Sequence, residues 1–72
     1  MTMIKAQMAG TMWKVLVKEG QQIAVDEEVA IIESMKMEIP VESEVAGTVT
    51  KVYVAENDFI DVDDPLFDIE EA

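Results

Sequence analysis

The 72-residue chain contains no cysteine and no histidine. Without cysteine it can form neither a disulfide nor a thiolate metal site, so apolar packing and backbone pairing must hold it together. The lack of both residue types also removes the usual nucleophile–base pairs and the common zinc ligand sets. We therefore expect a chain that is not itself an enzyme and that holds no metal ion.

Two further absences concern membranes and targeting. No stretch approaches the roughly 18 consecutive apolar residues of a membrane span. The N-terminus also lacks a basic region followed by an apolar segment. We therefore expect a soluble, cytoplasmic protein. A chain of this length makes one small domain, so we expect a single domain over residues 1–72.

Basic residues are scarce, since 5 lysines stand against 16 acidic residues and the net charge is -11. Such a charge repels the phosphates of nucleic acids and anionic lipid surfaces alike. We expect neither nucleic acid nor membrane as a partner, and a monomer in isolation. Protein clefts of positive charge are the natural partners.

An internal repeat dominates what the sequence does contain. Residues 10–33 align with residues 47–70 at a constant offset of 37, without a gap, and 11 of these 24 positions are identical. The identical pairs are Gly10/Gly47, Thr11/Thr48, Lys14/Lys51, Val15/Val52, Val17/Val54, Glu19/Glu56, Ile23/Ile60, Val25/Val62, Asp26/Asp63, Ile32/Ile69 and Glu33/Glu70. Such self-similarity predicts two halves related by quasi-two-fold symmetry.

Each copy contains two segments with the composition of strands. Residues 12–17 and 49–54 are rich in β-branched and aromatic residues and are bounded by turn signals. Residues 29–33 and 66–70 form the last strand of each copy. Because no helical period of useful length is present, the pattern predicts an all-β fold that is duplicated.

Side-chain alternation assigns the two faces of the first strand of each copy. Val15 and Val52 are expected on the core face, while Lys14 and Lys51 point to solvent. Val29 and Ile32 in the next strand are three residues apart, which strict alternation cannot place on one face. Either a bulge or burial on both faces would resolve this spacing. Four apolar residues in the acidic loops are expected to seal the ends of the core: Ile23, Val25, Ile60 and Val62.

Two kinds of glycine position recur in the repeat. Gly20 corresponds to Asn57, and both residue types tolerate left-handed backbone, so one turn geometry is expected twice. Gly10 and Gly47 occupy the same position of each copy, which indicates a positive φ or a close backbone approach at a strand start.

The two copies are joined by a connector that opens with Met35 and Lys36, directly after Glu33 and Ser34. Here the chain resembles the biotinyl/lipoyl attachment domains, whose biotinyl branch carries a Met-Lys-Met turn that a ligase modifies on the lysine. Three segments carry the resemblance to the first strand, the first turn and the attachment hairpin of that family: residues 9–15, 17–20 and 33–39.

The resemblance implies a flattened barrel or sandwich of two antiparallel four-stranded sheets, with the termini at one end and the Lys36 hairpin at the other. It further implies a biotin carboxyl carrier. In that role a biotin ligase recognises Met35 and Met37 and attaches biotin covalently to Lys36. The attached cofactor then acts as a swinging arm that moves a carboxyl group from biotin carboxylase to carboxyltransferase.

A lysine amine has a reference pKa of ~10.4, so at neutral pH it is protonated and a poor nucleophile. Glu33 and Glu38 lie near Lys36 in sequence, and negative charge close to an amine favours its ammonium form. The chain is therefore expected to be a passive substrate, and the modifying enzyme must supply both the base and the activated acyl group.

Three details of the sequence bear on this resemblance. Ser34 stands where many biotinyl relatives have alanine, and Gln7 where many have proline. The gap-free repeat leaves no room for the protruding loop found in the carrier subunits of some bacterial acetyl-CoA carboxylases. The chain most resembles the small free-standing biotin/lipoyl attachment proteins.

Three alternatives stay open. A lipoyl carrier would use the same lysine for acyl transfer in 2-oxo acid dehydrogenase or glycine cleavage complexes, but its relatives more often carry Asp-Lys-Ala. An acidic module for ions or proteins would use the carboxylates of residues 58–64, although these lack the EF-hand spacing. Finally, the modification could persist as a mark or serve as a biotin reservoir.

Overall fold

The computed structural model describes residues 1–72 and contains eight β-strands. The strands are β1 (Thr2–Lys5), β2 (Gly10–Val15), β3 (Gln22–Ile23), β4 (Glu28–Ser34), β5 (Met37–Glu42), β6 (Gly47–Val52), β7 (Phe59–Ile60) and β8 (Pro65–Glu71). No helix that could cross a membrane is found.

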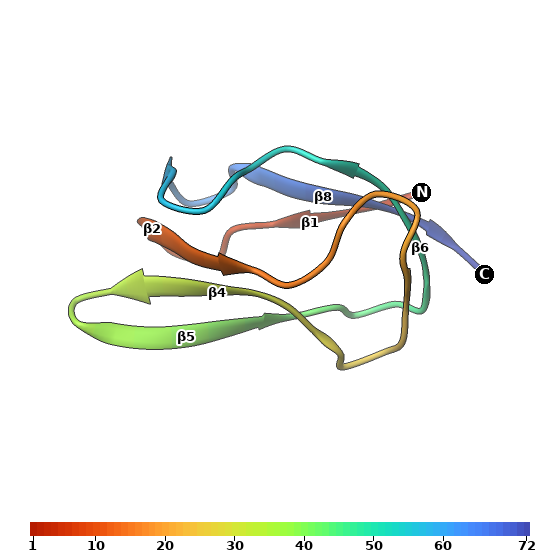
Figure 1. The fold of residues 1–72 in the computed structure, drawn as a ribbon, viewed down its shortest axis with the longest axis horizontal. Coiled ribbons are helices and arrows are strands. Elements are labelled where there is room, and N and C mark those ends of the chain that lie inside the picture. Colours follow the sequence, from red (N-terminus) through yellow and green to blue (C-terminus); the bar gives the residue numbers. More distant parts are fainter.

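The strands form two antiparallel sheets that face each other. One sheet has the order β1-β8-β6-β3 and the other the order β5-β4-β2-β7, so each begins and ends with an open edge. The β4–β5 hairpin forms one end of the elongated molecule, and both termini lie at the other end (Figure 1). This arrangement confirms the all-β fold of two four-stranded sheets.

The quasi-two-fold relation reaches beyond the repeat that is visible in the sequence. The backbone N–H of Ser43 donates to the carbonyl of Glu27, and the N–H of Ala6 donates to the carbonyl of Asp64, both at 2.9 Å. These two bonds are related by the same offset of 37. Because Ala6 follows β1 and Ser43 follows β5, the offset also relates these two edge strands, whose residues are nearly all different.

Bulges explain the spacing of the apolar residues. In β4 the pairing with β5 skips Val29, and in β8 the pairing with β1 skips Leu66, its equivalent. The extra residue lets Val29 and Ile32 both enter the core, where their exposed fractions are 0% and 1%. The structure therefore shows the bulge, the first of the two alternatives.

The strands β2 and β6 begin two residues earlier than the sequence predicted, at Gly10 and Gly47. A Cβ atom at either glycine would collide with a backbone carbonyl oxygen of the neighbouring strand, at Glu33 and Glu70 respectively. Close approach is therefore the reason for these glycines, and neither has a positive φ. The expected left-handed turn does occur twice, with φ of 89° at Gly20 and 76° at the equivalent asparagine.

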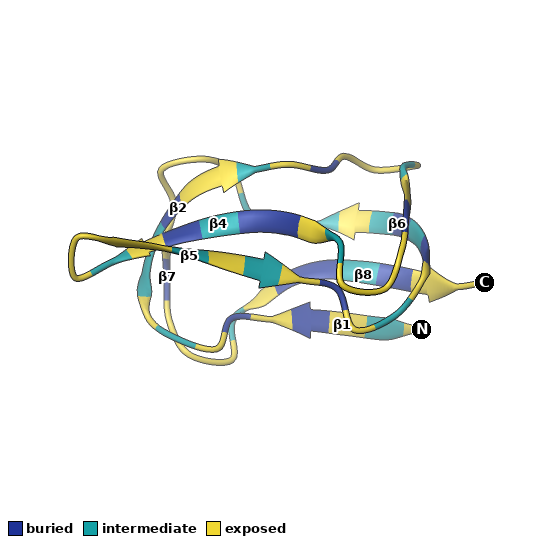
Figure 2. Ribbon diagram, turned by 90° about the horizontal axis from the view of Figure 1, so that it is seen from below, coloured by how far each residue is buried: buried dark blue, intermediate teal, exposed yellow.

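The core lies between the sheets (Figure 2). Its buried members are all apolar: Ile4, Ala6, Met12, Val17, Ile23, Val29, Ala30, Ile32, Val49, Ile60, Leu66, Phe67 and Ile69. Val15 and Val52 are half-buried against this cluster, while Lys14 and Lys51 are exposed, as alternation predicted.

One expectation about the ends of the core is wrong. Ile23 and Ile60 are buried, but Val25 and Val62 are each 54% exposed. The reason is local, because Val25 is followed by Asp26 with a φ of 67° in a tight turn that the N–H of Glu27 closes onto the carbonyl of Ala24. Residues at the tip of such a turn point to solvent, and the second copy repeats the geometry.

Candidate attachment site

Lys36 lies at the tip of the β4–β5 hairpin. Ser34 and Met37 form the last pair of the ladder, so only Met35 and Lys36 make the loop. Their φ angles are 52° and 64°. Positive φ at both central residues defines a type I′ turn, the form whose twist matches that of the flanking strands.

This backbone conformation is unusual for the residues that adopt it. Type I′ turns favour Asn-Gly and similar pairs, because residues with a Cβ are strained in the left-handed region by roughly 1–2 kcal/mol each. Here a methionine and a lysine occupy both positions. Backbone strain of this kind clusters at active sites, ligand clamps and switch regions, which makes this turn a candidate functional site.

The tip of the hairpin is fully open to solvent (Figure 2). Met35 is 92% exposed and Met37 is 64% exposed, and Lys36 between them is exposed as well. A catalytic Schiff-base lysine sits in a desolvated or cationic pocket, and no such wall surrounds this amine. The geometry instead suits an amine that is presented to another protein.

The carboxylates that the sequence placed near Lys36 are brought together across the hairpin. Glu33 of β4 pairs with Glu38 of β5 in the row directly before the turn. Both side chains are exposed, so water screens them, while Ser34 is half-buried.

The row of paired residues that contains Glu33 and Glu38 continues across the whole sheet. It ends at Phe59, a residue that the sequence analysis did not single out. Glu33 pairs with Thr11 of β2, and Thr11 pairs with Phe59 of β7. The ring of Phe59 is 89% exposed. The sequence did hold a signal, because Phe59 corresponds in the repeat to the polar residue Gln22.

The acidic residues of the second-copy loop serve the local backbone. The carboxylate of Asp58 accepts a hydrogen bond from the N–H of Ala55, and that of Asp64 accepts one from the N–H of Asp61, both at 2.8 Å. Asp63 takes a left-handed conformation, with a φ of 70°. No group of three or more carboxylates is placed so that it could hold a metal ion.

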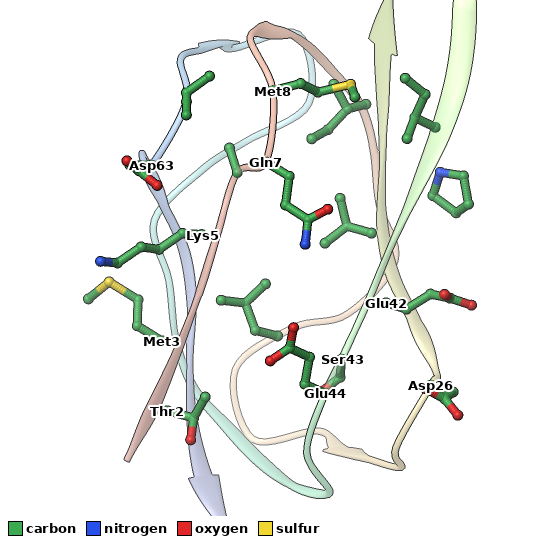
Figure 3. Close-up of a pocket in the computed structure, with 17 residues that line it drawn as sticks. Thr2, Met3, Lys5, Gln7, Met8, Asp26, Glu42, Ser43, Glu44 and Asp63 are labelled. Carbon is green, nitrogen blue, oxygen red and sulfur yellow. The ribbon is translucent and has the colours of Figure 1, made fainter.

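A cavity of about 570 Å³ lies between the edge strands β1 and β5 and does not include Lys36. Gln7 and Glu44 point into it, whereas Met3 and Lys5 point away (Figure 3). It is the gap left where the two sheets do not close. The cavity is therefore lined in part by the strands of the attachment hairpin, but it does not reach the turn that carries Lys36.

Comparison with known families bears on this hairpin. The family described as "Biotin-requiring enzyme", the biotin/lipoyl domain, matches residues 1–69. The chain belongs to the biotin/lipoyl attachment family. As a biotin/lipoyl attachment domain it is a carrier domain, a class that also occurs within carboxylases.

Among curated proteins, the biotin/lipoyl attachment protein of Bacillus subtilis (strain 168) is 63% identical over 38 residues, which are 53% of this chain and 52% of that protein. The match thus spans about half of either protein. Among solved structures, the urea carboxylase of Kluyveromyces lactis aligns with 96% of this domain and 6% of its own chain, with a TM-score of 0.89 and 26% identity.

A lipoyl domain is nearly as similar. The solution structure of the lipoyl domain of the 2-oxoglutarate dehydrogenase complex from Azotobacter vinelandii has a TM-score of 0.83 and 25% identity. That alignment covers 99% of this chain and 98% of the lipoyl domain. The fold thus accommodates either kind of cofactor domain.

Proposed function

We propose that this domain is a biotin carboxyl carrier whose Lys36 is biotinylated by a biotin ligase. The observation that carries the proposal is the Met35-Lys36-Met37 triplet on an exposed two-residue turn at the end of the molecule opposite the termini. The match to the family of biotin-requiring enzymes and the similarity to a urea carboxylase support biotin as the cofactor.

The residues present fit covalent attachment of biotin. In the modification an amide bond forms between Nζ of Lys36 and the carboxyl carbon of an activated biotin, while the bond from that carbon to the activating group breaks. The activating group, derived from ATP, leaves as a phosphate-containing product, and the amine protons pass to a base on the ligase. Met35 and Met37 are flexible and polarizable, which suits them to mark this lysine among the five of the chain. Both are exposed enough for a partner to reach them.

When attached, biotin supplies a ureido nitrogen that accepts and delivers a carboxyl group. The domain supplies the rest. Its hairpin holds Lys36 at the end of the molecule opposite the termini (Figure 1), and the four-carbon side chain gives reach. Tethering raises the local concentration of the cofactor at the sites of biotin carboxylase and carboxyltransferase, its proposed partners in the cytoplasm.

A lipoyl carrier is the second candidate, and the similarity to a whole lipoyl domain favours it. In that case the same lysine would carry lipoate and the chain would serve acyl transfer. Met35 and Met37 favour biotin as the cofactor, because lipoyl domains more often carry Asp-Lys-Ala around the lysine.

The proposed role is tested with the biotinylated chain as a substrate of a biotin carboxylase, in the presence of ATP and radiolabelled bicarbonate. We expect label on the chain at concentrations far below those that free biotin requires, because the enzyme also contacts the domain. The matched control is Lys36→Arg treated in the same way. A biotinylated chain that takes up label no better than free biotin would contradict the carboxyl carrier and favour a reservoir or mark.

A further inference from the structure

The repeat provides an internal comparison for Phe59. Phe59 of β7 pairs with Thr11, and its equivalent Gln22 of β3 pairs with Thr48 in the same register. Both side chains are exposed. The fold therefore accepts a polar residue at this position, and nothing in the packing of the core requires a phenylalanine there.

What differs between the two positions is their distance from Lys36. Phe59 lies in the row Glu38–Glu33–Thr11–Phe59, directly before the row that closes the attachment turn. Gln22 lies in the other sheet, where its row continues through Thr48 to Glu70 near the C-terminus. The aromatic residue thus occurs only in the copy that places it at the attachment end.

The spacing brings Phe59 within reach of any enzyme that covers the turn. Two strand spacings of about 4.8 Å separate Glu33 from Phe59, which gives roughly 10 Å. A standard interface buries about 800 Å² on each partner, which is a disc with a radius of roughly 16 Å. The turn begins two residues further along β4, or ~7 Å, so a disc of this radius centred on the turn also reaches the ring.

The charges around the ring indicate the chemistry of the partner. Glu33 and Glu38 share the row with Phe59, and Asp58 precedes it in the chain. The net charge of the whole chain is -11. An exposed ring among carboxylates is complementary to an apolar pocket with a basic rim.

We propose that Phe59 is a second anchor for the ligase that acylates Lys36, and that its ring enters an apolar pocket bordered by basic residues on that enzyme. The inference rests on the proposed function, because it names a contact made during that modification. It assigns a role to a residue outside the attachment hairpin.

The test compares the kinetics of biotinylation for the unmodified chain, Phe59→Gln and Gln22→Phe, with a biotin ligase, biotin and ATP. Each substitution installs the residue that the other copy already has, so both variants are expected to fold, and the thermal midpoint of each is measured beside the kinetics. We expect Phe59→Gln to lower kcat/KM by about tenfold, which is typical for loss of an aromatic anchor. The loss should appear in KM with kcat unchanged, because the contact is made equally in the ground and transition states.

Gln22→Phe should leave both kinetic parameters as they are, since that position lies away from the turn. Equal kcat/KM for Phe59→Gln and the unmodified chain would overturn the inference, as would an equal loss in both variants. Failure of the proposed function would look different, because then the unmodified chain itself would gain no biotin.

Discussion

At the scale of single residues, the attachment turn combines an unfavourable backbone with an exposed side chain. Met35 and Lys36 are the only residues with positive φ that have no counterpart in the other copy. The other left-handed positions occur in pairs, at Gly20 with Asn57 and at Asp26 with Asp63, and shape loops that the fold needs. The strained backbone at the turn is thus specific to the connector that exposes Lys36, and the repeated fold does not require it.

This strain can be measured. Replacing Met35 by asparagine and Lys36 by glycine installs the pair that type I′ turns favour. We expect the double variant to raise the free energy of unfolding by about 1 kcal/mol, because the relief of backbone strain exceeds the added flexibility of the unfolded chain. Urea denaturation measures the change, and the same variant should accept no cofactor. A less stable variant would show that the turn is not strained.

At the scale of the strands, one cross-strand contact has a titratable signature. The hydroxyl of Tyr53, just after β6, donates to the carboxylate of Asp68 in β8 at 2.6 Å. This hydrogen bond, then desolvation and then the negative charge of Asp68 raise the pKa of Tyr53 above its ordinary value of 10.0. The ring also lies under the amine of Lys51, 5.1 Å from its centroid.

Absorbance near 295 nm follows this titration cleanly, because Tyr53 is the one tyrosine of the chain. We expect its pKa to lie above 10.0, and Asp68→Asn to bring it down towards that value. The sign of the effect on stability follows. Because the pKa of Tyr53 is raised in the folded state, its hydrogen bond to Asp68 contributes to the stability of the fold below pH 10. This contribution is lost as the pH rises through the folded pKa. An unchanged titration in Asp68→Asn would contradict the assignment.

The strands also show what the sequence could reveal about the fold. The repeat predicted the quasi-two-fold relation of the halves and the left-handed turns at Gly20 and Asn57. Side-chain alternation predicted that Val15 and Val52 face the core. The sequence could not choose between a bulge at Val29 and burial of the strand on both faces, because the register of a strand depends on its partner strand. The exposure of Val25 was missed for a similar reason, since one left-handed residue after it decides where its side chain points.

For the site, the resemblance to the attachment domains implied both Lys36 as the modified residue and the hairpin that carries it. The structure shows the hairpin, while the modification of Lys36 stays a prediction. Phe59 could not be placed near the turn from the sequence, since the row that links it to Glu33 and Glu38 crosses three strand pairings. Its mismatch with Gln22 was the only signal, and that mismatch has meaning only once the ends of the molecule are known.

At the scale of the whole molecule, the two halves share a backbone plan and some core residues, but they differ in their largest core side chains. The equivalent positions Ala30 and Phe67 are both 0% exposed, so a small and a large side chain fill corresponding places. Phe67 and Met12 are the largest fully buried side chains. The two largest core side chains therefore occupy positions that the repeat does not preserve.

The two phenylalanines of the chain give a matched pair of variants. Phe67→Ala should cost about 3–5 kcal/mol through lost burial and a residual cavity. A domain of this size has a total stability of only about 4–11 kcal/mol, so the variant should be largely unfolded or have a much lower thermal midpoint. Phe59→Ala should change stability by less than about 0.5 kcal/mol, because that ring is 89% exposed. Thermal unfolding monitored by circular dichroism measures the stability of both variants. Similar losses of stability in Phe67→Ala and Phe59→Ala would show that the core is assigned wrongly.

The central claim is that Lys36 carries biotin, and the intact mass of the protein tests it most directly. The chain and Lys36→Arg are exposed separately to a biotin ligase with biotin and to a lipoate ligase with lipoate. We predict one biotinyl increment on the chain and none on Lys36→Arg, which keeps the charge and the fold of an exposed turn. A lipoyl increment alone would move the domain to acyl transfer, and no increment with either ligase would contradict the account.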